Sequence, residues 1–323
     1  MTDVRVGIVS WNTADLLRRC LDALPAALAP LDAEVVVVDN ASQDGSADMA
    51  AECDWVRVLR NDDNRGYAAA MNQALAGDPV RALIALNPDT LPAPGSLAHL
   101  VRRLDDEPSL GLVAPRLVNA NGSVQHSVYR FPSLATAAAV CLVPAAGHRR
   151  FLGRRFWLEG GAPHDRRETV DWPIGAVHCI RTAALDGKPP YSERSFIYTE
   201  DMDLCWRLWR TGWQVEYDPS VAVTHVGNAS GEQAFGPDRT LRWLHETYGW
   251  MARERGALRT WLWAAINAVG VALDMLTGLP RALPSTPAAK QRRYVIRQLS
   301  RQLQVHLHHV ARPARRPPGA VPS

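Results

Sequence analysis

Short runs of β-branched side chains alternate with segments of helical periodicity through the first hundred residues. Strand-like runs cover 4–11, 34–39, 55–59 and 81–86, and helical patterns cover 14–28, 46–52 and 67–75. The continuous run Val35–Val38 is typical of a strand covered on both faces, and the helical crossovers are long enough for parallel pairing. The pattern predicts an α/β fold with a doubly wound, mostly parallel sheet and helices on both faces. Its ligand is expected beyond the carboxyl ends of the strands.

The regular pattern weakens over 130–170, where Pro, Gly and Arg are frequent, and this composition predicts a mobile loop or a segment that contacts the acceptor. Regular structure resumes with the run 170–180, a helix at 200–210, and strands at 213–217 and 221–225. Beyond Gly236 the chain looks helical. We therefore expect three parts: a ligand-binding domain over 1–235 with two halves that divide near residue 120, a helical extension over 236–310, and a disordered basic tail over 311–323.

Composition narrows the class of protein. Hydrophobic residues make up 47% and charged residues 21% of 323, which is typical of a globular chain. Five cysteines lie far apart without a CxxC pair, so neither a zinc site nor a disulfide framework is expected, and a reducing compartment fits best. No secretory signal is visible at the N-terminus, so we expect a cytoplasmic protein. The net charge of +3 gives no indication of a nucleic-acid partner.

Two acidic residues each follow a buried strand. Asp39 ends the valine-rich run, and Asp89 follows the run 81–86 within Asn87-Pro88-Asp89. Either residue alone is most simply a turn former. Two carboxylates at one sheet edge would repel the phosphates of a nucleotide unless a divalent cation lay between them, and Mg²⁺ or Mn²⁺ with oxygen ligands would serve.

A third acidic residue, Asp201, lies in the first turn of the helix expected at 200–210. Thr199 is the expected N-cap, and acids in a first turn commonly stabilise the helix dipole. Asp203 shares a face with Arg207 and Arg210, which predicts a solvated ion-pairing stripe. Asp201 instead shares its face with apolar residues, where an unpaired charge is costly. This placement favours a functional role for Asp201.

Five sequence strings occur in a characteristic order: VDNAS at 38–42, NRGYAAAMNQA at 64–74, LNPDT at 86–90, YTEDMDLCWRLWRTGW at 198–213 and VTHVGNAS at 223–230. Together they resemble the inverting family-2 glycosyltransferases of GT-A fold, specifically their rhamnosyltransferase-like branch. The resemblance spans 4–230. It implies transfer of a sugar from a nucleotide-diphosphate donor to an acceptor hydroxyl with inversion at the anomeric carbon.

The resemblance also assigns roles residue by residue. Asp201 matches the catalytic base, and Glu200 is expected to brace it or to contact the acceptor. Asp89 matches the final acid of the metal motif, and His225 matches a histidine near the diphosphate or metal. The expected donor-binding residues are Ser10, Asn12, Asp39, Asn40, Asn64, Gly66, Asn72, Asn87 and Asp89. Gly66 is expected to let the backbone approach the nucleotide closely.

The metal motif departs from the usual Asp-x-Asp pattern, because Asn87 stands where the first acid would be. One carboxylate remains, so the expected Mg²⁺ or Mn²⁺ would rest on Asp89, the diphosphate, water and His225.

The C-terminal part is distinct in charge. From Arg281 onward there are nine basic residues and no acidic one. The 19-residue span Trp261–Leu279 contains one charge, Asp274, and at about 28 Å it is long enough to cross a bilayer core. A polar stripe along it favours an interfacial amphipathic helix over a spanning one, followed by a second amphipathic helix that anionic lipid would attract. The alternatives are a solvated helical hairpin that packs on the catalytic domain and a homodimer contact.

Three functions follow from the sequence. The first is an inverting transferase that moves rhamnose or another deoxyhexose from a dTDP-linked donor to a glycan, a lipid-linked acceptor or a small molecule. The second uses a UDP-hexose or UDP-N-acetylhexosamine donor on the same fold. The third is a non-catalytic nucleotide-sugar sensor or membrane scaffold, which the placement of Asp201 disfavours.

Overall fold

A computed structural model describes residues 3–142, 165–227, 236–282 and 287–312. The chain forms two compact units, one of 1–130 with 162–236 and the other of 131–161 with 237–323. The expected continuous domain over 1–235 is therefore interrupted, because the segment that contains α5 (Leu134–Leu142) packs with the C-terminal helices. Most of the loop expected at 130–170, and the tail beyond residue 312, lie outside the described residues.

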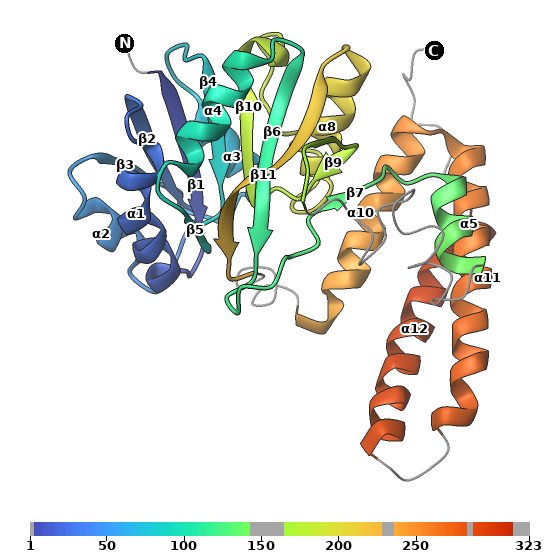
Figure 1. The fold of residues 1–323 in the computed structure, drawn as a ribbon. Helices are drawn as coiled ribbons and strands as arrows, with labels where there is room; N and C mark the ends of the chain where they lie inside the picture. Colours follow the sequence, from blue (N-terminus) through green and yellow to red (C-terminus); the bar gives the residue numbers. More distant parts are fainter. Residues whose placement is uncertain (1–2, 143–164, 228–235, 283–286, 313–323) are drawn as a thin grey trace. The chain divides into compact units, whose positions relative to one another are not determined.

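The first unit contains a nine-stranded mixed sheet in the order β3-β2-β1-β4-β10-β6-β11-β5, with β8 beside β11 (Figure 1). The strands are β1 (Val4–Ser10), β2 (Ala33–Asp39), β3 (Val56–Arg60), β4 (Ala82–Leu86), β5 (Thr90–Pro92), β6 (Leu110–Val118), β8 (Glu168–Thr169), β10 (Val177–Arg181) and β11 (Gln214–His225). Strands β3, β2, β1 and β4 are parallel, as the sequence pattern predicts. A separate pair, β7 (Val128–Tyr129) and β9 (Trp172–Pro173), is antiparallel.

Three features of the sheet differ from the sequence analysis. Strand β10 runs antiparallel between β4 and β6, and it occupies only the second half of the run 170–180. Strand β6 was not expected. The two strands expected at 213–217 and 221–225 form one strand, β11, whose pairing with β6 shifts register between Asp218 and Ala222. A bulge of this kind bends a strand without ending it.

Helices cover both faces of the sheet. Val4, Val6 and Ile8 of β1 pack in one core cluster with side chains of α1 (Ala14–Leu28) and α4 (Ser96–Asp106). Gly7 faces the other side of the sheet, where an added Cβ would lie 2.8 Å from Leu75 in α3 (Tyr67–Leu75). The alternation along one strand therefore separates two helical layers. The remaining helices of this unit are α2 (Ser46–Ala51), the 3₁₀ turn η2 (Thr182–Leu185) and α8 (Glu200–Arg210).

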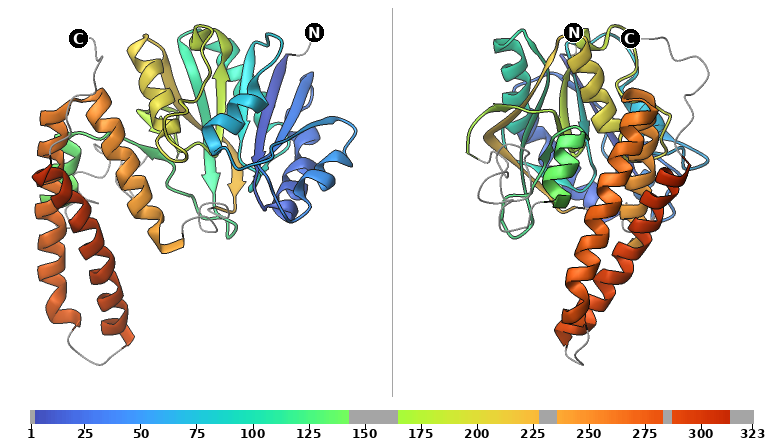
Figure 2. Two further views of the ribbon diagram at one scale, coloured as in Figure 1. Left: turned by 180° about the vertical axis from the view of Figure 1, so that it is seen from behind. Right: turned by 90° about the vertical axis from the view of Figure 1, so that its right-hand side faces the viewer.

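The second unit is helical. It contains α5, the short turn η3 (Gly236–Asp238), α10 (Arg239–Glu254), α11 (Ala257–Ala282) and α12 (Pro287–Ala311). Helices α11 and α12 pack side by side along most of their length (Figure 2). Tyr248 donates to or accepts from His306 Nδ1 at 2.7 Å, and its ring packs edge-on against Trp263. One helical stretch, Ala257–Thr277, has the length and hydropathy of a membrane span, and 28% of its most apolar window is buried.

Candidate active site

Five of the expected donor-binding residues lie at the carboxyl ends of β1, β2 and β4, namely Ser10, Asp39, Asn40, Asn87 and Asp89. Pairing aligns Ser10 with Asp39 and Ile8 with Leu86, so Asp39 and the turn Asn87–Asp89 lie at the same edge of the sheet. This is the edge at which an open parallel sheet binds ligands.

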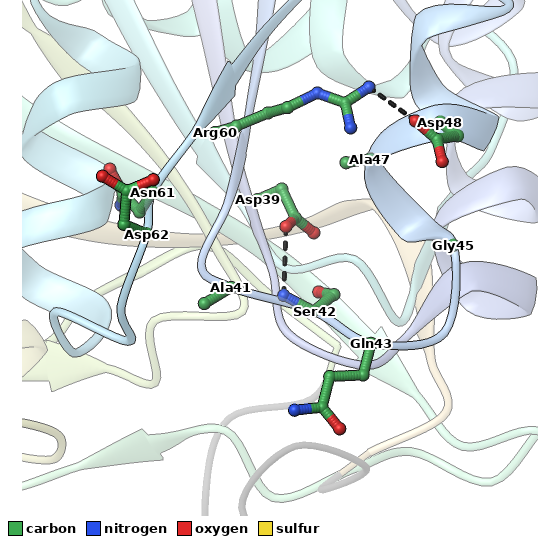
Figure 3. A pocket seen from close by; sticks show the side chains of 10 residues that line it. All are labelled: Asp39, Ala41, Ser42, Gln43, Gly45, Ala47, Asp48, Arg60, Asn61 and Asp62. Carbon is green, nitrogen blue, oxygen red and sulfur yellow. Dashed lines mark hydrogen bonds and ion pairs between the residues drawn. The ribbon is translucent and has the colours of Figure 1, made fainter.

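Asp39 is buried, and its two carboxylate oxygens differ. Oδ2 accepts a 3.0 Å hydrogen bond from the backbone N–H of Ser42. Oδ1 is buried and has no hydrogen-bond partner among the described residues. A polar hollow of about 450 Å³ lies beside this carboxylate (Figure 3), lined by Asp39, Ala41, Ser42, Gln43, Gly45, Ala47, Asp48, Arg60, Asn61 and Asp62. An unsatisfied buried acceptor beside an open hollow is suited to an N–H donor of a ligand.

Ser10 and Asn12 hold the loops around this hollow. The Ser10 hydroxyl is fully buried and hydrogen-bonds the Thr13 hydroxyl at 2.9 Å. Asn12 Oδ1 accepts from the Gln43 N–H at 2.7 Å, and the Asn12 N–H donates to Ser42 Oγ at 3.0 Å. These bonds tie the β1–α1 loop to the β2–α2 loop. The donor binding expected for Ser10 and Asn12 stays a prediction beside this structural role.

Asn40 and Asn64 organise the next loop. Asn40 Nδ2 donates to Asn64 Oδ1 at 2.8 Å, and Asn40 Oδ1 accepts from Asn61 Nδ2 at 3.0 Å and from the Arg65 N–H at 3.1 Å. Asn64 Oδ1 also accepts from the Gly66 N–H at 3.0 Å. The side chains thus satisfy backbone groups of the loop that leads into α3.

Gly66 does make a close approach, but to the chain itself. Its φ is +80°, and a Cβ there would lie 2.4 Å from the carbonyl oxygen of Phe196. The same carbonyl accepts a 3.0 Å hydrogen bond from the N–H of Tyr67. Glycine is therefore required where the start of α3 meets the segment before α8.

Asn72 lies on α3 and faces the segment 191–193. Its Nδ2 donates to the Tyr191 carbonyl at 2.8 Å and to Glu193 Oε1 at 2.9 Å, while its Oδ1 accepts from the Tyr191 N–H at 3.1 Å. All polar atoms of this amide are thus engaged within the chain, so we propose no donor contact for Asn72.

Asp89 and His225 meet at the end of β11. His225 Nε2 lies 3.4 Å from Asp89 Oδ1, and both side chains are buried. Asp89 Oδ1 has no hydrogen bond to any described residue. A buried carboxylate oxygen without a partner, beside an imidazole nitrogen, fits two ligands of one divalent cation. Within the described residues there is no group of three or more His, Cys, Asp or Glu side chains suited to a metal, so further ligands would come from substrate and water.

The loop between β9 and β10 connects Asp89 to Asp201. The N–H of Asn87 donates to the Ala176 carbonyl at 2.9 Å. Gly175, the residue before Ala176, donates its N–H to Asp201 Oδ2 at 3.1 Å. Two consecutive residues of one loop therefore hydrogen-bond the turn of the expected metal motif and the expected base.

Asp201 is half-buried, and two backbone N–H groups hold its carboxylate. Its Oδ1 accepts from the Met202 N–H at 2.7 Å, in addition to the bond from Gly175. Burial raises the pKa of Asp201 to about 6, even though these backbone hydrogen bonds favour the charged form. A carboxylate with this pKa is mostly ionised at neutral pH and basic enough to accept a proton.

The turn before α8 carries backbone strain. Tyr198 and Thr199 both have positive φ, 71° and 70°, which is unusual for two consecutive residues other than glycine. Thr199 precedes the helix as expected, but its side chain makes no capping hydrogen bond. The strained turn fixes where Glu200 and Asp201 enter the site, and Glu200 is buried there.

The face of α8 opposite Asp201 was expected to be solvated, but it is covered. Asp203 is buried and accepts from Arg207 Nε at 3.1 Å. The guanidinium of Arg207 also donates to the carbonyls of Pro189 and Pro190. The segment 189–190 therefore covers this face, which periodicity alone does not reveal.

Three residues of the site were not singled out from the sequence. Tyr67 Oη donates to the Gly175 carbonyl at 3.3 Å, and burial raises its pKa, with further increases from the charges of Glu200, Asp201 and Asp89. The phenol thus lies close to all three acids. Gly175 holds Asp201, and Gln125 Oε1 lies 2.8 Å from His225 Nδ1. Tyr67 adjoins Gly66 in the string 64–74, whereas Gly175 and Gln125 lie outside every recognised string.

The family model described as Glycosyl transferase family 2 matches residues 5–159. The chain contains a glycosyl transferase family 2 domain. It is a glycosyltransferase enzyme with rhamnosyltransferase homologues. This confirms the family, the enzyme class and the α/β fold with a mostly parallel sheet and a C-terminal helical part.

Relatives of this glycosyltransferase include the N-acetylglucosaminyl-diphospho-decaprenol L-rhamnosyltransferase of Mycobacterium tuberculosis, 29% identical over 81% of this chain and 93% of the relative. Rhamnosyltransferase WbbL of Escherichia coli is 30% identical over 27% of this chain and 32% of its own length. Among solved structures, the mannosyltransferase PcManGT of Pyrobaculum calidifontis, in complex with GDP-Man and Mn²⁺, has a TM-score of 0.57 at 18% identity, covering 96% of this chain and 87% of its own. That likeness supports the fold alone.

Proposed function

We propose that this glycosyltransferase moves rhamnose or another deoxyhexose from a pyrimidine nucleotide-diphosphate donor to an acceptor hydroxyl by a single inverting displacement. The placement of Asp201 carries the proposal. This carboxylate is half-buried, has a pKa raised to about 6, and is tied through Gly175 and Ala176 to the turn that holds Asp89. The rhamnosyltransferase named among the relatives supports the choice of sugar.

Asp39 supports a uracil or thymine nucleotide. Its Oδ2 is engaged by Ser42, and its buried Oδ1 has no hydrogen-bond partner among the described residues. One N–H, such as the imide of uracil or thymine, would satisfy this oxygen. A guanine edge offers two parallel N–H donors, which a carboxylate recognises best with both oxygens free. The hollow beside Asp39 would then receive the base of dTDP or UDP.

Asp201 acts as the general base in this proposal. Its carboxylate accepts the proton of the acceptor hydroxyl while the hydroxyl oxygen forms a bond to the anomeric carbon. The bond from that carbon to the diphosphate oxygen breaks in the same step, so the configuration inverts. General-base assistance of this kind contributes about 10²–10⁴-fold. Gly175 and Met202 hold the carboxylate toward the reacting hydroxyl through their N–H groups.

Asp89 and His225 would hold Mg²⁺ or Mn²⁺ beside the diphosphate. Such an ion supplies Lewis-acid stabilisation of the negative charge that the leaving diphosphate gains. Tyr67 would keep its proton throughout, since burial and the neighbouring acids raise its pKa.

The acceptor is proposed to be a lipid-linked sugar. The Mycobacterium tuberculosis relative is named for a decaprenol-diphosphate substrate and aligns with 81% of this chain. A lipid-linked acceptor requires the enzyme to work at a membrane, and we propose the inner face of the plasma membrane, with the enzyme in the cytoplasm.

The helical unit supports such a membrane contact. Leu258, Val269, Leu273 and Leu276 are exposed on α11 and share one stripe of the helix. Helix α12 contains no acidic residue and exposes Lys290, Arg293 and Arg297. Apolar side chains beside a basic helix are suited to the surface of an anionic bilayer.

Liposome sedimentation of the full chain tests this contact. We expect binding to vesicles with 30% phosphatidylglycerol, about tenfold weaker for the variant Lys290→Gln/Arg293→Gln/Arg297→Gln. Equal binding of the variant, binding to neutral vesicles alone, or a stable dimer without vesicle binding would overturn it.

A donor screen tests the function. The purified chain is incubated with dTDP-rhamnose, UDP-glucose, UDP-N-acetylglucosamine or GDP-mannose and a polyprenyl-diphosphate-linked N-acetylglucosamine, and the products are weighed by mass spectrometry. Transfer of a deoxyhexose from dTDP-rhamnose is expected. Transfer from a UDP donor alone would select the second function, and transfer from GDP-mannose alone would refute the assignment of the base pocket.

A further inference from the structure

Gln125 lies where it can control which nitrogen of His225 faces Asp89. The residue follows Val124, which pairs with Val118 at the end of β6, and its N–H donates to the Leu117 carbonyl at 2.9 Å. Its side chain reaches β11, where Oε1 lies 2.8 Å from His225 Nδ1. The two residues are 100 positions apart in sequence.

The chemistry of this contact fixes the imidazole tautomer. An amide oxygen carries no hydrogen, so His225 Nδ1 must carry the proton of the hydrogen bond to Gln125 Oε1. In a neutral imidazole the other nitrogen then has a lone pair. That nitrogen, Nε2, lies 3.4 Å from Asp89 Oδ1.

When the imidazole is neutral, its Nε2 lone pair and the Asp89 carboxylate are two acceptors that face each other in a buried place. His225 and Asp89 are each 6% exposed, and Asp89 Oδ1 has no hydrogen bond within the described part of the chain. Without a positive charge between them, the lone pair and the carboxylate repel each other. A separation of 3.4 Å suits neighbouring ligands of one small cation, whose bonds to N and O are about 2.0–2.2 Å long.

We propose that Gln125 is the positioning residue of this cation site: it holds His225 in the Nδ1–H tautomer so that the Nε2 lone pair is available to a divalent metal beside Asp89. The inference rests on the proposed use of a cation by this enzyme. Gln125 would act through His225, which its Oε1 contacts, and not as a ligand of the metal. Partners of this kind commonly change metal affinity by about 10–100-fold when they are removed.

The first measurement reads the tautomer without metal or turnover. The full chain is labelled with ¹⁵N-histidine, and His225 is assigned by comparison with His225→Gln. We expect Nδ1 to carry the proton in the wild type and in Gln125→Glu, whose carboxylate accepts from the same N–H. In Gln125→Leu the tautomer should no longer be fixed. An Nε2–H tautomer in the wild type would overturn the proposal.

The second measurement reads metal affinity. Free Mn²⁺ is followed by electron paramagnetic resonance during titration of the full chain, with and without dTDP. We expect Gln125→Leu to bind Mn²⁺ about 10–100-fold more weakly than the wild type and Gln125→Glu to restore binding. Gln214→Leu makes the same change at the exposed start of β11 and should bind as the wild type does.

The outcomes separate this proposal from the proposed function. Wild-type binding no tighter than that of His225→Ala would overturn the cation site itself. Tight wild-type binding that is unchanged in Gln125→Leu would overturn the role of Gln125 alone. Circular dichroism melts of every variant check that the fold is kept.

Discussion

The backbone N–H of Gly175 donates a 3.1 Å hydrogen bond to Asp201 Oδ2, across 26 residues of sequence. Gly175 also lies against the Asp201 side chain, since a Cβ at this glycine would be 3.4 Å from Asp201 Cβ. The bond favours the ionised carboxylate, while burial favours the neutral acid and prevails. The result is a carboxylate that is fixed in direction and more basic than an exposed aspartate.

Replacing this carboxylate by an amide should abolish most of the transfer. Asp201→Asn keeps the size of the side chain but cannot accept the acceptor proton, so kcat should fall about 10²–10⁴-fold. Binding of dTDP, measured by calorimetry, should stay within about twofold because Asp201 does not face the base pocket. Asp186→Asn makes the same change at an exposed residue and should leave kcat unchanged. Retention of more than about a tenth of the transfer would refute Asp201 as the base.

The rate of transfer should depend on pH through the same group. Because burial raises the pKa of Asp201 to about 6, the base is protonated and inactive below that value. We expect kcat/KM to rise about tenfold per pH unit up to pH 6 and to level off above it. An initial-rate series from pH 4.5 to 8.5 measures this profile. A flat profile between pH 5 and 7 would contradict the assignment.

Asp39 should control nucleotide affinity. In Asp39→Asn the amide can still accept from the Ser42 N–H, but its N–H₂ group then replaces Oδ1, and on the proposed function it would meet the N–H of the base. We expect dTDP and UDP to bind about 10–100-fold more weakly, as when a hydrogen bond to a charged group is lost. Calorimetry of both nucleotides measures the loss, with Asp63→Asn, an exposed aspartate, as the control. Equal affinities in the Asp39 variant would place the base elsewhere.

Two glycines with the same φ test the contact between α3 and the segment before α8. Gly66 and Gly122 both have φ of +80°, but only at Gly66 would a Cβ meet the chain, 2.4 Å from the Phe196 carbonyl oxygen. Gly122→Ala should cost about 1 kcal/mol for the backbone conformation alone. Gly66→Ala should cost at least about 2 kcal/mol more and lower kcat, since Phe196 leads into the strained turn. Urea unfolding measures the free energy of unfolding of both variants. Equal losses would mean that the segment at Phe196 moves to accept the added Cβ without loss of stability.

The helical unit should lose stability in acid. Burial lowers the pKa of His306 to about 4, below its value of about 6.5 in an unfolded chain. The unfolded chain therefore binds a proton first, and stability present above pH 6.5 is lost as the pH falls toward 4. The loss is at most about 3 kcal/mol. His306→Asn keeps an acceptor for Tyr248 and should reduce the fall in Tm between pH 7 and 5, whereas His308→Asn, at an exposed residue, should not.

The sequence predicted the positions of Asp39 and Asp89 in the sheet better than it predicted the contacts around them. Asp39 and Asp89 could be found because each follows a buried run, and strand ends of a parallel sheet share an edge. Ser10, Asn12, Asn64 and Asn72 were grouped with them, but their side chains bond to the chain's own loops. An asparagine in a loop serves a backbone group or a ligand equally well, so its residue type does not distinguish the two.

The sequence pattern also did not predict the direction of β10 or the segment that covers one face of α8. The run 170–180 contains a turn and one short strand, and nothing in its composition indicates that the strand runs opposite to its neighbours. Asp203 was placed on the correct face of α8, but the segment that buries this face lies 13 residues upstream, at Pro190. Contacts of this kind depend on chain path, which periodicity does not describe.

The reversed strand β10 has a consequence for how the site can change. Because β10 is antiparallel to β4, its first residue, Val177, pairs with the last residue of β4, Leu86. Gly175 and Ala176, which precede β10, therefore lie at the carboxyl end of β4. Adding one residue between Pro173 and Val177 would displace both Gly175, which hydrogen-bonds Asp201, and Ala176, which hydrogen-bonds Asn87. Lengthening the turn after β2, by contrast, would reshape the base pocket and leave the proton acceptor in place. On the proposed function, the contacts to the two ends of the nucleotide sugar could thus be altered independently.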